Sequence, residues 1–280
     1  MNHRSLLVLL DNEPACTLRT RFAVGLARSQ GYHLIGLAPT GVIDMTSTMG
    51  SATALAETTE RAWEALHDQA ARVIRAFDAE CSAAGVESFE TLVDPTDPTG
   101  SLICHAHAAD LVVLSQPGGL GAGRRRAPNL VDEVVLKCAR PTLVVPRSGR
   151  LDSVATRVLV AWDDSREAAR ALSDAVPILR HARRVELMLC RVPGVADDAA
   201  LHARLDAVQR WLERRGITSE VRVEPTAGAV ARALHSRALA TNADLIVMGA
   251  YGHARWIERV LGGTTRSTLA TLDVPVLMSH

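Results

Sequence analysis

"ADLIVMGAYGH", residues 243–253, is the stretch that decides the fold. A predicted strand over residues 244–248 ends there at Gly249, and the same pattern occurs 134 residues earlier as "ADLVVLSQPGG" (109–119). The two segments match without a gap, and "RPTLVVP" (140–146) and "VPVLMSH" (274–280) repeat at the same offset. Self-similarity of this kind indicates that the chain contains two copies of one fold.

The amino-terminal parts of the two copies also match. "SLLVLLDNE" (5–13) corresponds to "RVLVAWDDS" (157–165), which places Asp11 under Asp163 at an offset of 152. The first copy therefore carries 18 more residues than the second, the difference between the two offsets, and we place them around residues 40–55. We expect two domains of ordinary size, residues 1–150 and 151–280, joined near "RSGRLDS" (147–153).

Each copy alternates short β-branched runs with amphipathic helical stretches. In the second copy Ser165 is an expected N-cap with Glu167 in the first turn, Asp198 is a second N-cap, and Gly216 is in the C′ position. This order predicts an α/β protein of two tandem Rossmann-like domains, each a five-stranded, mostly parallel sheet with helices on both faces. The first copy has the same order, with a long helix over 54–84. The predicted strands of the second copy are 158–161, 185–190, 220–224, 244–248 and 274–278, and its predicted helices are 165–181, 198–215, 230–240 and a segment over 255–261.

The composition is that of an ordinary globular protein, 48% apolar and 22% charged. Lys and Arg together (31) equal Asp and Glu together (31), so no net charge draws the chain to nucleic acid or to a membrane surface. The five cysteines are odd in number and lack metal-ligand spacing. We therefore expect a cytoplasmic protein with reduced thiols, no metal site, and neither nucleic acid nor membrane as a partner.

The glycines of the second copy lie where ligands bind in open α/β sheets, beyond the carboxyl ends of the strands. Glycine at position 249 permits close approach of a ligand and a positive φ. Further on, "GGTT" (262–265) precedes a stretch that we expect to be helical over 266–272. N–H groups at a helix start and threonine hydroxyls suit a phosphate, but the same glycines suit ordinary loop ends, so spacing alone leaves both interpretations open.

The wider pattern resembles the universal stress protein family. The spacing Gly249-x2-Gly252-x9-Gly262 lies between "DLIVM" and "VPVLM", and "VLVAWDDS" (158–165) resembles the family's first strand with its Asp-x-Ser. The likeness covers essentially the whole chain as two tandem copies and implies the adenine nucleotide alpha hydrolase-like form of the fold. In that family the aspartate contacts the nucleoside, the glycine loop wraps the ATP phosphates, and backbone after the second strand, here 190–192, meets the adenine. The candidate nucleotide-binding residues are therefore Asp163, Val192, Gly249, Gly252, His253, Gly262, Gly263, Thr264 and Thr265.

One position departs from the family pattern, in which a serine or threonine follows the last glycine. Here Gly263 follows Gly262, and Thr264 comes one residue later. The loss of one neutral hydrogen bond is worth about 0.5–1.5 kcal/mol, which weakens ATP binding without abolishing it.

The first copy departs further. Ser115 stands under Gly249, Pro128 under Gly262 and Asn129 under Gly263, while Gly118 matches Gly252. Proline removes one backbone donor and fixes φ, so this loop cannot close on a phosphate in the same way. Glu13 under Ser165 adds negative charge, for which Arg124, Arg125 and Arg126 can compensate, although a solvated loop is the commoner explanation. We interpret the first copy as a degenerate domain that does not bind ATP and that stabilises or regulates the protein.

Other polar residues carry weaker signals. His105 and His107 are two residues apart on a predicted helix and lie on different faces, which argues against a metal pair. Arg266 is a candidate for phosphate contact, and Trp162 is expected in the core. Asp164 beside Asp163 can hold Mg²⁺ with the phosphates or simply belong to a turn.

Three hypotheses follow. The first is a cytoplasmic, ATP-binding regulatory module of the stress response, with one site in residues 151–280 and at most slow ATP hydrolysis. The second is a structural or interaction protein of the same fold that binds no nucleotide. The third is an enzyme of the related hydrolase-like group, against which the absence of an identifiable substrate pocket or metal triad speaks. The last strands, "TLVVP" and "VPVLM", have unpaired edges, and the resemblance implies that they pair, within the chain or in a dimer.

Overall fold

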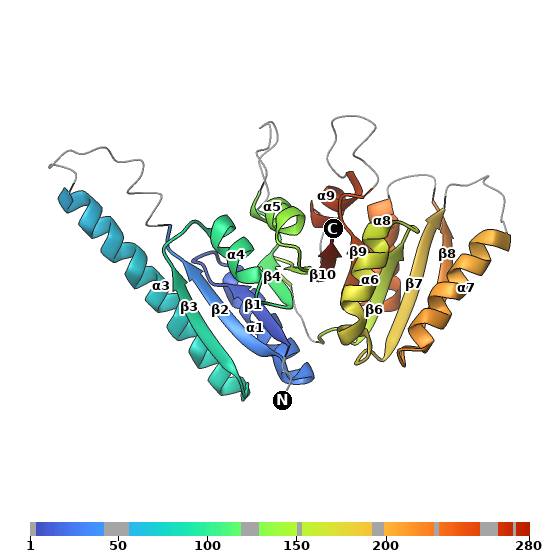
Figure 1. Cartoon of the computed structure of the whole chain (residues 1–280), viewed down its shortest axis with the longest axis horizontal. Helices are drawn as coiled ribbons and strands as arrows, with labels where there is room; N and C mark the ends of the chain where they lie inside the picture. The colour runs from blue at the N-terminus through green and yellow to red at the C-terminus, as the bar shows by residue number, and fades with distance from the viewer. Residues whose placement is uncertain are drawn as a thin grey trace. The chain divides into compact units, whose positions relative to one another are not determined.

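The computed structural model describes residues 4–41, 56–118, 129–149, 153–191, 199–226, 230–252, 263–270 and 273–280, with backbone alone at 56–62, 263, 264, 266 and 270. The described chain divides into two compact units, Met1–Ser148 and Gly149–His280. Both consist of alternating strands and helices (Figure 1).

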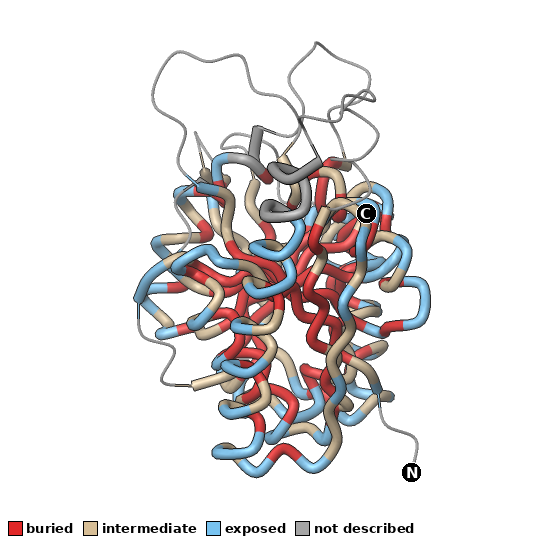
Figure 2. The backbone as a smooth tube through the Cα atoms, turned by 90° about the vertical axis from the view of Figure 1, so that its left-hand side faces the viewer, coloured by how far each residue is buried: buried red, intermediate tan, exposed pale blue. Residues whose placement is uncertain are grey.

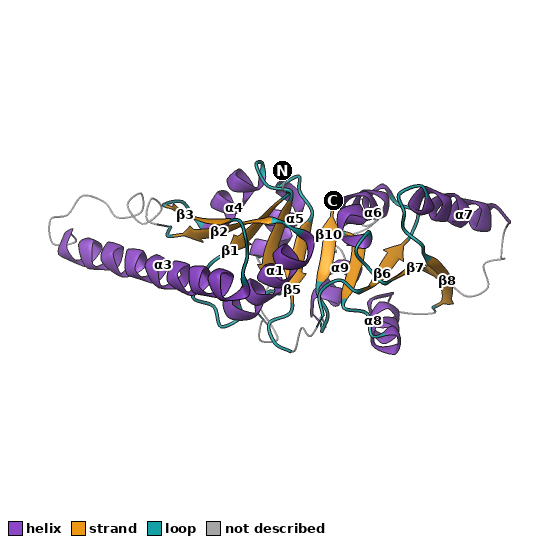
Figure 3. Ribbon diagram, turned by 90° about the horizontal axis from the view of Figure 1, so that it is seen from below, coloured by secondary structure: helices purple, strands orange, loops and turns teal. Residues whose placement is uncertain are grey.

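The first unit is a parallel sheet with the strand order β3-β2-β1-β4-β5. Helices α1 and α3 contact each other on one face, and α4 and α5 contact each other on the other face (Figure 3). Its elements are β1 (Ser5–Leu9), α1 (Cys16–Gln30), β2 (His33–Pro39), α3 (Ala56–Ala84), β3 (Phe89–Asp94), α4 (Pro98–Ala106), β4 (Leu111–Ser115), α5 (Leu130–Lys137) and β5 (Thr142–Val145).

The second unit repeats this arrangement in the order β10-β9-β6-β7-β8, again with parallel pairing. Helices α8 and α9 contact each other on one face, and α6 and α7 lie on the opposite face (Figure 3). Its elements are β6 (Arg157–Trp162), α6 (Arg166–Leu179), β7 (Arg184–Arg191), α7 (Ala199–Glu213), β8 (Glu220–Pro225), α8 (Val230–Thr241), β9 (Leu245–Gly249), α9 (Gly263–Ala270) and β10 (Val276–Ser279).

The strand register confirms the internal repeat. Leu6 of β1 lies opposite Leu111 of β4, and Val158 of β6 lies opposite Leu245 of β9. Leu6 corresponds to Val158 at the offset of 152 residues, and Leu111 corresponds to Leu245 at the offset of 134 residues. The predicted α/β, Rossmann-like fold is therefore confirmed down to the pairing of its central strands.

The core of each unit lies along its central strands, where buried residues concentrate (Figure 2). Leu7, Val112 and Leu245 are 0% exposed. Such strands are covered on both faces, so they consist of continuous apolar runs. Trp162, which the sequence places in the core, is 8% exposed, and that prediction is confirmed.

Two of the predicted helix ends are also confirmed. Ser165 caps α6, and its hydroxyl oxygen accepts a hydrogen bond from the Ala168 N–H at 3.1 Å. At the end of α7, Gly216 has φ +76°, and the Ile217 N–H reaches back to the Leu212 carbonyl at 3.1 Å. The third predicted cap, Asp198, lies outside the described residues.

Two segments differ from expectation. Helix α3 has 29 residues and its counterpart α7 has 15, so much of the additional length in the first copy extends a helix. Helix α9 begins at Gly263 and includes Thr264 and Thr265, whereas we expected it to begin at residue 266. The predicted helical segment 255–261, and most of the 40–55 stretch, lie outside the described residues.

Candidate functional site

The turn that follows β6 fixes Asp163 at the start of α6. Its carboxylate oxygen Oδ1 accepts hydrogen bonds from the Ser165 N–H at 3.1 Å and from the Ser165 hydroxyl at 2.5 Å. The same hydroxyl caps the helix through Ala168, so Asp163 orients the capping group. The next residue, Asp164, has φ +62° and forms an ion pair with Arg204 of α7 at 2.9 Å.

Gly249 ends β9 directly against this turn. A Cβ atom at position 249 would lie 2.6 Å from the Ala168 nitrogen and 2.6 Å from the Glu167 carbonyl carbon. Both are backbone atoms that cannot move aside, so only glycine allows β9 to pack against the first turn of α6. Gly249 does not adopt the positive φ that glycine permits; that conformation occurs two residues later, at Tyr251 with φ +60°.

A buried carboxylate lies beside the second glycine. A Cβ atom on Gly252 would lie 2.8 Å from Oε2 of Glu167, and Glu167 is 5% exposed. Burial alone would raise the pKa of Glu167, but the hydrogen bond from Arg166 at 2.5 Å, with the charges of Arg166 and His280, outweighs burial and lowers that pKa. Glu167 therefore carries a negative charge at neutral pH, next to the segment that we expected to meet phosphate.

The segment after β9 is held from two sides. Thr265 of α9 is 3% exposed, and its hydroxyl oxygen accepts a hydrogen bond from the Tyr251 N–H at 3.3 Å. The imidazole Nδ1 of His280 lies 3.0 Å from the Ala250 carbonyl oxygen. The Thr265 hydroxyl thus fixes the glycine segment, a role that sequence reasoning did not assign to it.

The structure brings together four of the nine candidate residues, Asp163, Gly249, Gly252 and Thr265, around the first turn of α6 and the end of β9. It places Gly263 and Thr264 in the first turn of α9. Val192, His253 and Gly262 lie outside the described residues, as do Pro128 and the three arginines 124–126 of the first copy. The nine assignments remain predictions.

The first unit fills the corresponding place with an arginine. Arg19 is 1% exposed, and its Nε donates to the Leu9 carbonyl at 2.8 Å while its Nη1 donates to the Ser115 hydroxyl at 2.7 Å. Its Nη2 forms an ion pair with Asp11 at 3.0 Å. A single buried guanidinium therefore joins the ends of β1 and β4 and neutralises the aspartate that corresponds to Asp163.

The second unit has no such group at the matching position. Ala171 corresponds to Arg19 at the offset that relates Asp11 to Asp163, and it is 0% exposed. Gly249 corresponds to Ser115, so the second unit lacks both the arginine and the hydroxyl that binds it, although it keeps the aspartate. Sequence reasoning missed Arg19, although an arginine aligned with an alanine on the inner face of a helix was a usable signal.

A second ion pair in the first unit joins Glu13 and Arg147. The Glu13 carboxylate accepts from Arg147 Nη2 at 2.6 Å, and the Arg147 backbone N–H donates to the Gln116 side chain at 3.3 Å. Arg147 thus compensates the charge that Glu13 adds in place of Ser165, and no sequence pattern indicated this partner.

The described residues offer little for metal chemistry. In the described part of the chain, no three His, Cys, Asp or Glu side chains are grouped in a way that could hold a metal ion. All five cysteines are described, and all are free thiols. Among the described helices, none combines the length and apolar character needed to cross a membrane.

The fold defines a class, the doubly wound α/β proteins. Asp163 and Gly249 lie at the carboxyl ends of β6 and β9, the edge at which proteins of this class bind ligands. Residues 155–280 match the model of the universal stress protein family. A universal stress protein of Synechocystis sp. is 27% identical over 225 residues, which are 75% of this chain and 72% of that protein. The second unit thus matches the universal stress protein family, and the chain as a whole is similar to a member of it.

Solved structures show the same fold over the whole chain. A universal stress protein of Archaeoglobus fulgidus superimposes with a TM-score of 0.73 at 18% identity, and covers 100% of this chain and 99% of its own. A putative universal stress protein of Pseudomonas aeruginosa has a TM-score of 0.57 at 16% identity, over 99% of this chain and 93% of its own.

Proposed function

We propose that the second unit binds ATP at the edge formed by Asp163, the Gly249–Gly252 segment and the first turn of α9, and that the chain acts as a nucleotide-responsive regulatory module of the stress response. The match of residues 155–280 to the universal stress protein family and the position of Asp163 at the sheet edge support this proposal. In this proposal the first unit is a degenerate domain that does not bind ATP and that stabilises or regulates the chain.

The observation that carries the proposal is the exchange of Arg19 for Ala171. In the first unit a buried guanidinium occupies the space between the aspartate and the end of the neighbouring strand. In the second unit alanine and glycine stand at the matching positions, so no guanidinium occupies this edge. An adenosine there would meet Asp163 on one side and the end of β9 on the other.

The phosphates would extend toward α9. Because the helix begins at Gly263, the N–H groups of Gly263 and Thr264 lie in its first turn, where backbone donors lack intrahelical partners. Such donors and the helix dipole favour an anion. Helix α9 begins three residues earlier than we expected from the sequence. Its first N–H groups can therefore meet a phosphate at Gly263, even though Gly263 lacks the hydroxyl that the family has at this position.

One observation favours the alternative, an interaction protein of the same fold that binds no nucleotide. Glu167 places a buried negative charge against Gly252, where it opposes a triphosphate. Mg²⁺ bound with the phosphates would offset that charge, so the proposal includes Mg²⁺ as part of the ligand.

Calorimetric titration of the full chain with ATP and Mg²⁺ tests the proposal, together with chromatography of nucleotide released on denaturation. Asp163→Asn keeps the acceptor for Ser165 but removes the charge, and Asp11→Asn is the matched change in the first unit. We expect saturable binding of one ATP, weakened by Asp163→Asn and unchanged by Asp11→Asn. No released nucleotide and no heat up to millimolar ATP would support the interaction protein instead.

Location and assembly belong to the same proposal. Free thiols at all five cysteines suit the reducing cytoplasm. Dimerisation through the last strands, β5 and β10, is proposed from the resemblance, and sedimentation with and without ATP would measure it.

A further inference from the structure

The outer strand of the second unit presents charge on one face. Val221 and Val223 of β8 alternate with Glu220, Arg222 and Glu224, and side chains two residues apart lie on the same face of a strand. Arg222 and Glu224 line a groove shared with α8. The face of β8 toward α8 is therefore polar and cannot form an apolar core with that helix.

Helix α8 meets this face with small residues. Ala233, Ser236 and Ala240 line the groove, and their spacing of three and four residues places them on one face of the helix. Short side chains opposite a charged strand leave the space between them unfilled. The result is a groove of about 450 Å³, within the size range of small-molecule sites.

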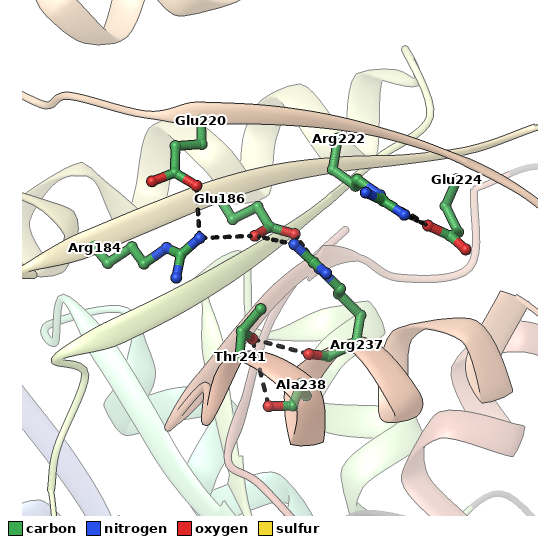
Figure 4. A network of polar contacts seen from close by, with 8 residues as sticks. All are labelled: Arg184, Glu186, Glu220, Arg222, Glu224, Arg237, Ala238 and Thr241. Carbon is green, nitrogen blue, oxygen red and sulfur yellow. Dashed lines mark hydrogen bonds and ion pairs between the residues drawn. The ribbon is translucent and has the colours of Figure 1, made fainter.

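Two of the three arginines of the groove have acidic partners (Figure 4). Arg237 makes two hydrogen bonds to Glu186 of β7, at 2.6 and 2.8 Å, and Glu186 is 3% exposed. Arg222 donates to Glu224 at 2.9 Å. Arg222 is exposed and has five N–H donors, so its pairing with one carboxylate oxygen leaves donors for a ligand.

The third arginine, Arg232, provides excess positive charge. It is exposed, lines the groove, and forms no ion pair with any residue in the described part of the chain. It also lies in the first turn of α8, where the helix dipole disfavours a cation and attracts an anion. Unpaired charge and helix dipole therefore favour the same ligand, an anion in the groove.

We propose that the groove between β8 and α8 binds a small metabolite through its phosphate or carboxylate group, held by Arg232 and Arg222, with the Ser236 hydroxyl available to a polar group beside it. Guanidinium groups match planar and tetrahedral oxyanions by paired N–H donors. The groove is larger than a bare ion requires, so the ligand is a small molecule with an oxyanion group.

The first unit does not share this arrangement. There the imidazole Nε2 of His105 on α4 lies 2.8 Å from the Asp94 carboxylate at the end of β3, and this contact joins the strand directly to the helix that follows it. The site is thus specific to the second unit. It lies on other elements than Asp163 and does not depend on nucleotide binding.

Amide NMR of the full chain tests the proposal, with inorganic phosphate and succinate as separate probes and chloride at matched ionic strength as the control. We expect saturable shifts of Ala233 and Ser236 in the millimolar range with one or both oxyanions, and none with chloride. The probe that acts identifies a phosphate or a carboxylate ligand. Shifts at Gly249 and Gly252 would report the proposed nucleotide site separately.

Arg232→Gln is the decisive variant, and Arg210→Gln, an exposed arginine on α7, is its matched control. Arg232→Gln removes a cation from the first turn of a helix, so it should leave the melting temperature unchanged or slightly raised. It should weaken oxyanion binding about tenfold, the effect of one charge-assisted hydrogen bond, while Arg210→Gln leaves binding intact. Equal binding by both variants, equal shifts with chloride, or no saturable shift at Ala233 and Ser236 would each overturn the proposal.

Discussion

Arg19 and Asp11 form an ion pair at 3.0 Å in which the arginine side chain is 1% exposed and the aspartate 28%. Burial of a guanidinium is tolerated here because its donors also meet the Leu9 carbonyl and the Ser115 hydroxyl. The pair joins two strand ends in the first unit, at the place that we propose for the ligand in the second.

We predict that Arg19→Leu destabilises the chain by about 2–4 kcal/mol, below the full range for a broken buried pair because Asp11 is partly solvated. The loss comes from the stranded Asp11 carboxylate and Leu9 carbonyl. Urea unfolding followed by circular dichroism measures it. Arg21→Ala is the control, since Arg21 is 64% exposed and its 3.5 Å pair with Glu80 contributes at most about 1 kcal/mol. Similar losses for the two variants would contradict the assignment.

Removal of the charge beside Gly252 should strengthen nucleotide binding. Glu167→Gln is expected to raise ATP affinity about fivefold without Mg²⁺, from roughly 1 kcal/mol of relieved repulsion, and less with Mg²⁺ present. Calorimetry measures both conditions, with Glu213→Gln on α7 as the control. Since the pKa of Glu167 is lowered, the charge persists at mildly acidic pH, and affinity should not rise between pH 8 and pH 6 through this group. An unchanged affinity in Glu167→Gln would show that the phosphates do not lie near Gly252.

Acid stability should depend on Asp94. Burial would raise the pKa of its carboxyl, but hydrogen bonds from Thr96 and His105 outweigh burial and lower that pKa to about 2. Because the folded pKa lies below the unfolded value near 4, the stabilisation is present above pH 4 and is lost as the pH falls toward 2. It should amount to roughly 2 kcal/mol.

Urea unfolding between pH 7 and pH 3 checks this, with Asp94→Asn compared to the original chain. The variant should be less stable at pH 7, and the difference should shrink as the pH falls below 4. A difference that stays constant with pH would exclude the carboxylate charge as its source.

Local patterns account for most of the fold. The strands and helices of the second unit follow from apolar periodicity, and Ser165 and Gly216 marked helix ends correctly because capping depends on neighbours in sequence. The start of α9 was misplaced because two glycines resemble a loop, whereas the contact between Thr265 and Tyr251 joins segments 14 residues apart.

The site was less predictable for the same reason. The burial of Arg19 depends on Ser115, 96 residues away, and the position of Glu167 beside Gly252 depends on the packing of β9 against α6. Sequence spacing points to Asp163 and the glycines as candidates, but the charge around them depends on these long-range contacts, which spacing does not reveal.

The glycines themselves provide a graded test of that packing. Gly249→Ala should cost about 3 kcal/mol, since the new methyl group would lie 2.6 Å from the backbone nitrogen of Ala168. Gly252→Ala should cost about 1 kcal/mol or less, because its nearest atom, 2.8 Å away, is the end of the flexible Glu167 side chain. Gly118→Ala in the first unit meets nothing closer than 3.8 Å and should be neutral. Thermal unfolding of the three variants should rank them in that order. If Gly249→Ala were tolerated as well as Gly118→Ala, glycine at 249 would not be required by α6, and a ligand would become the better reason for it.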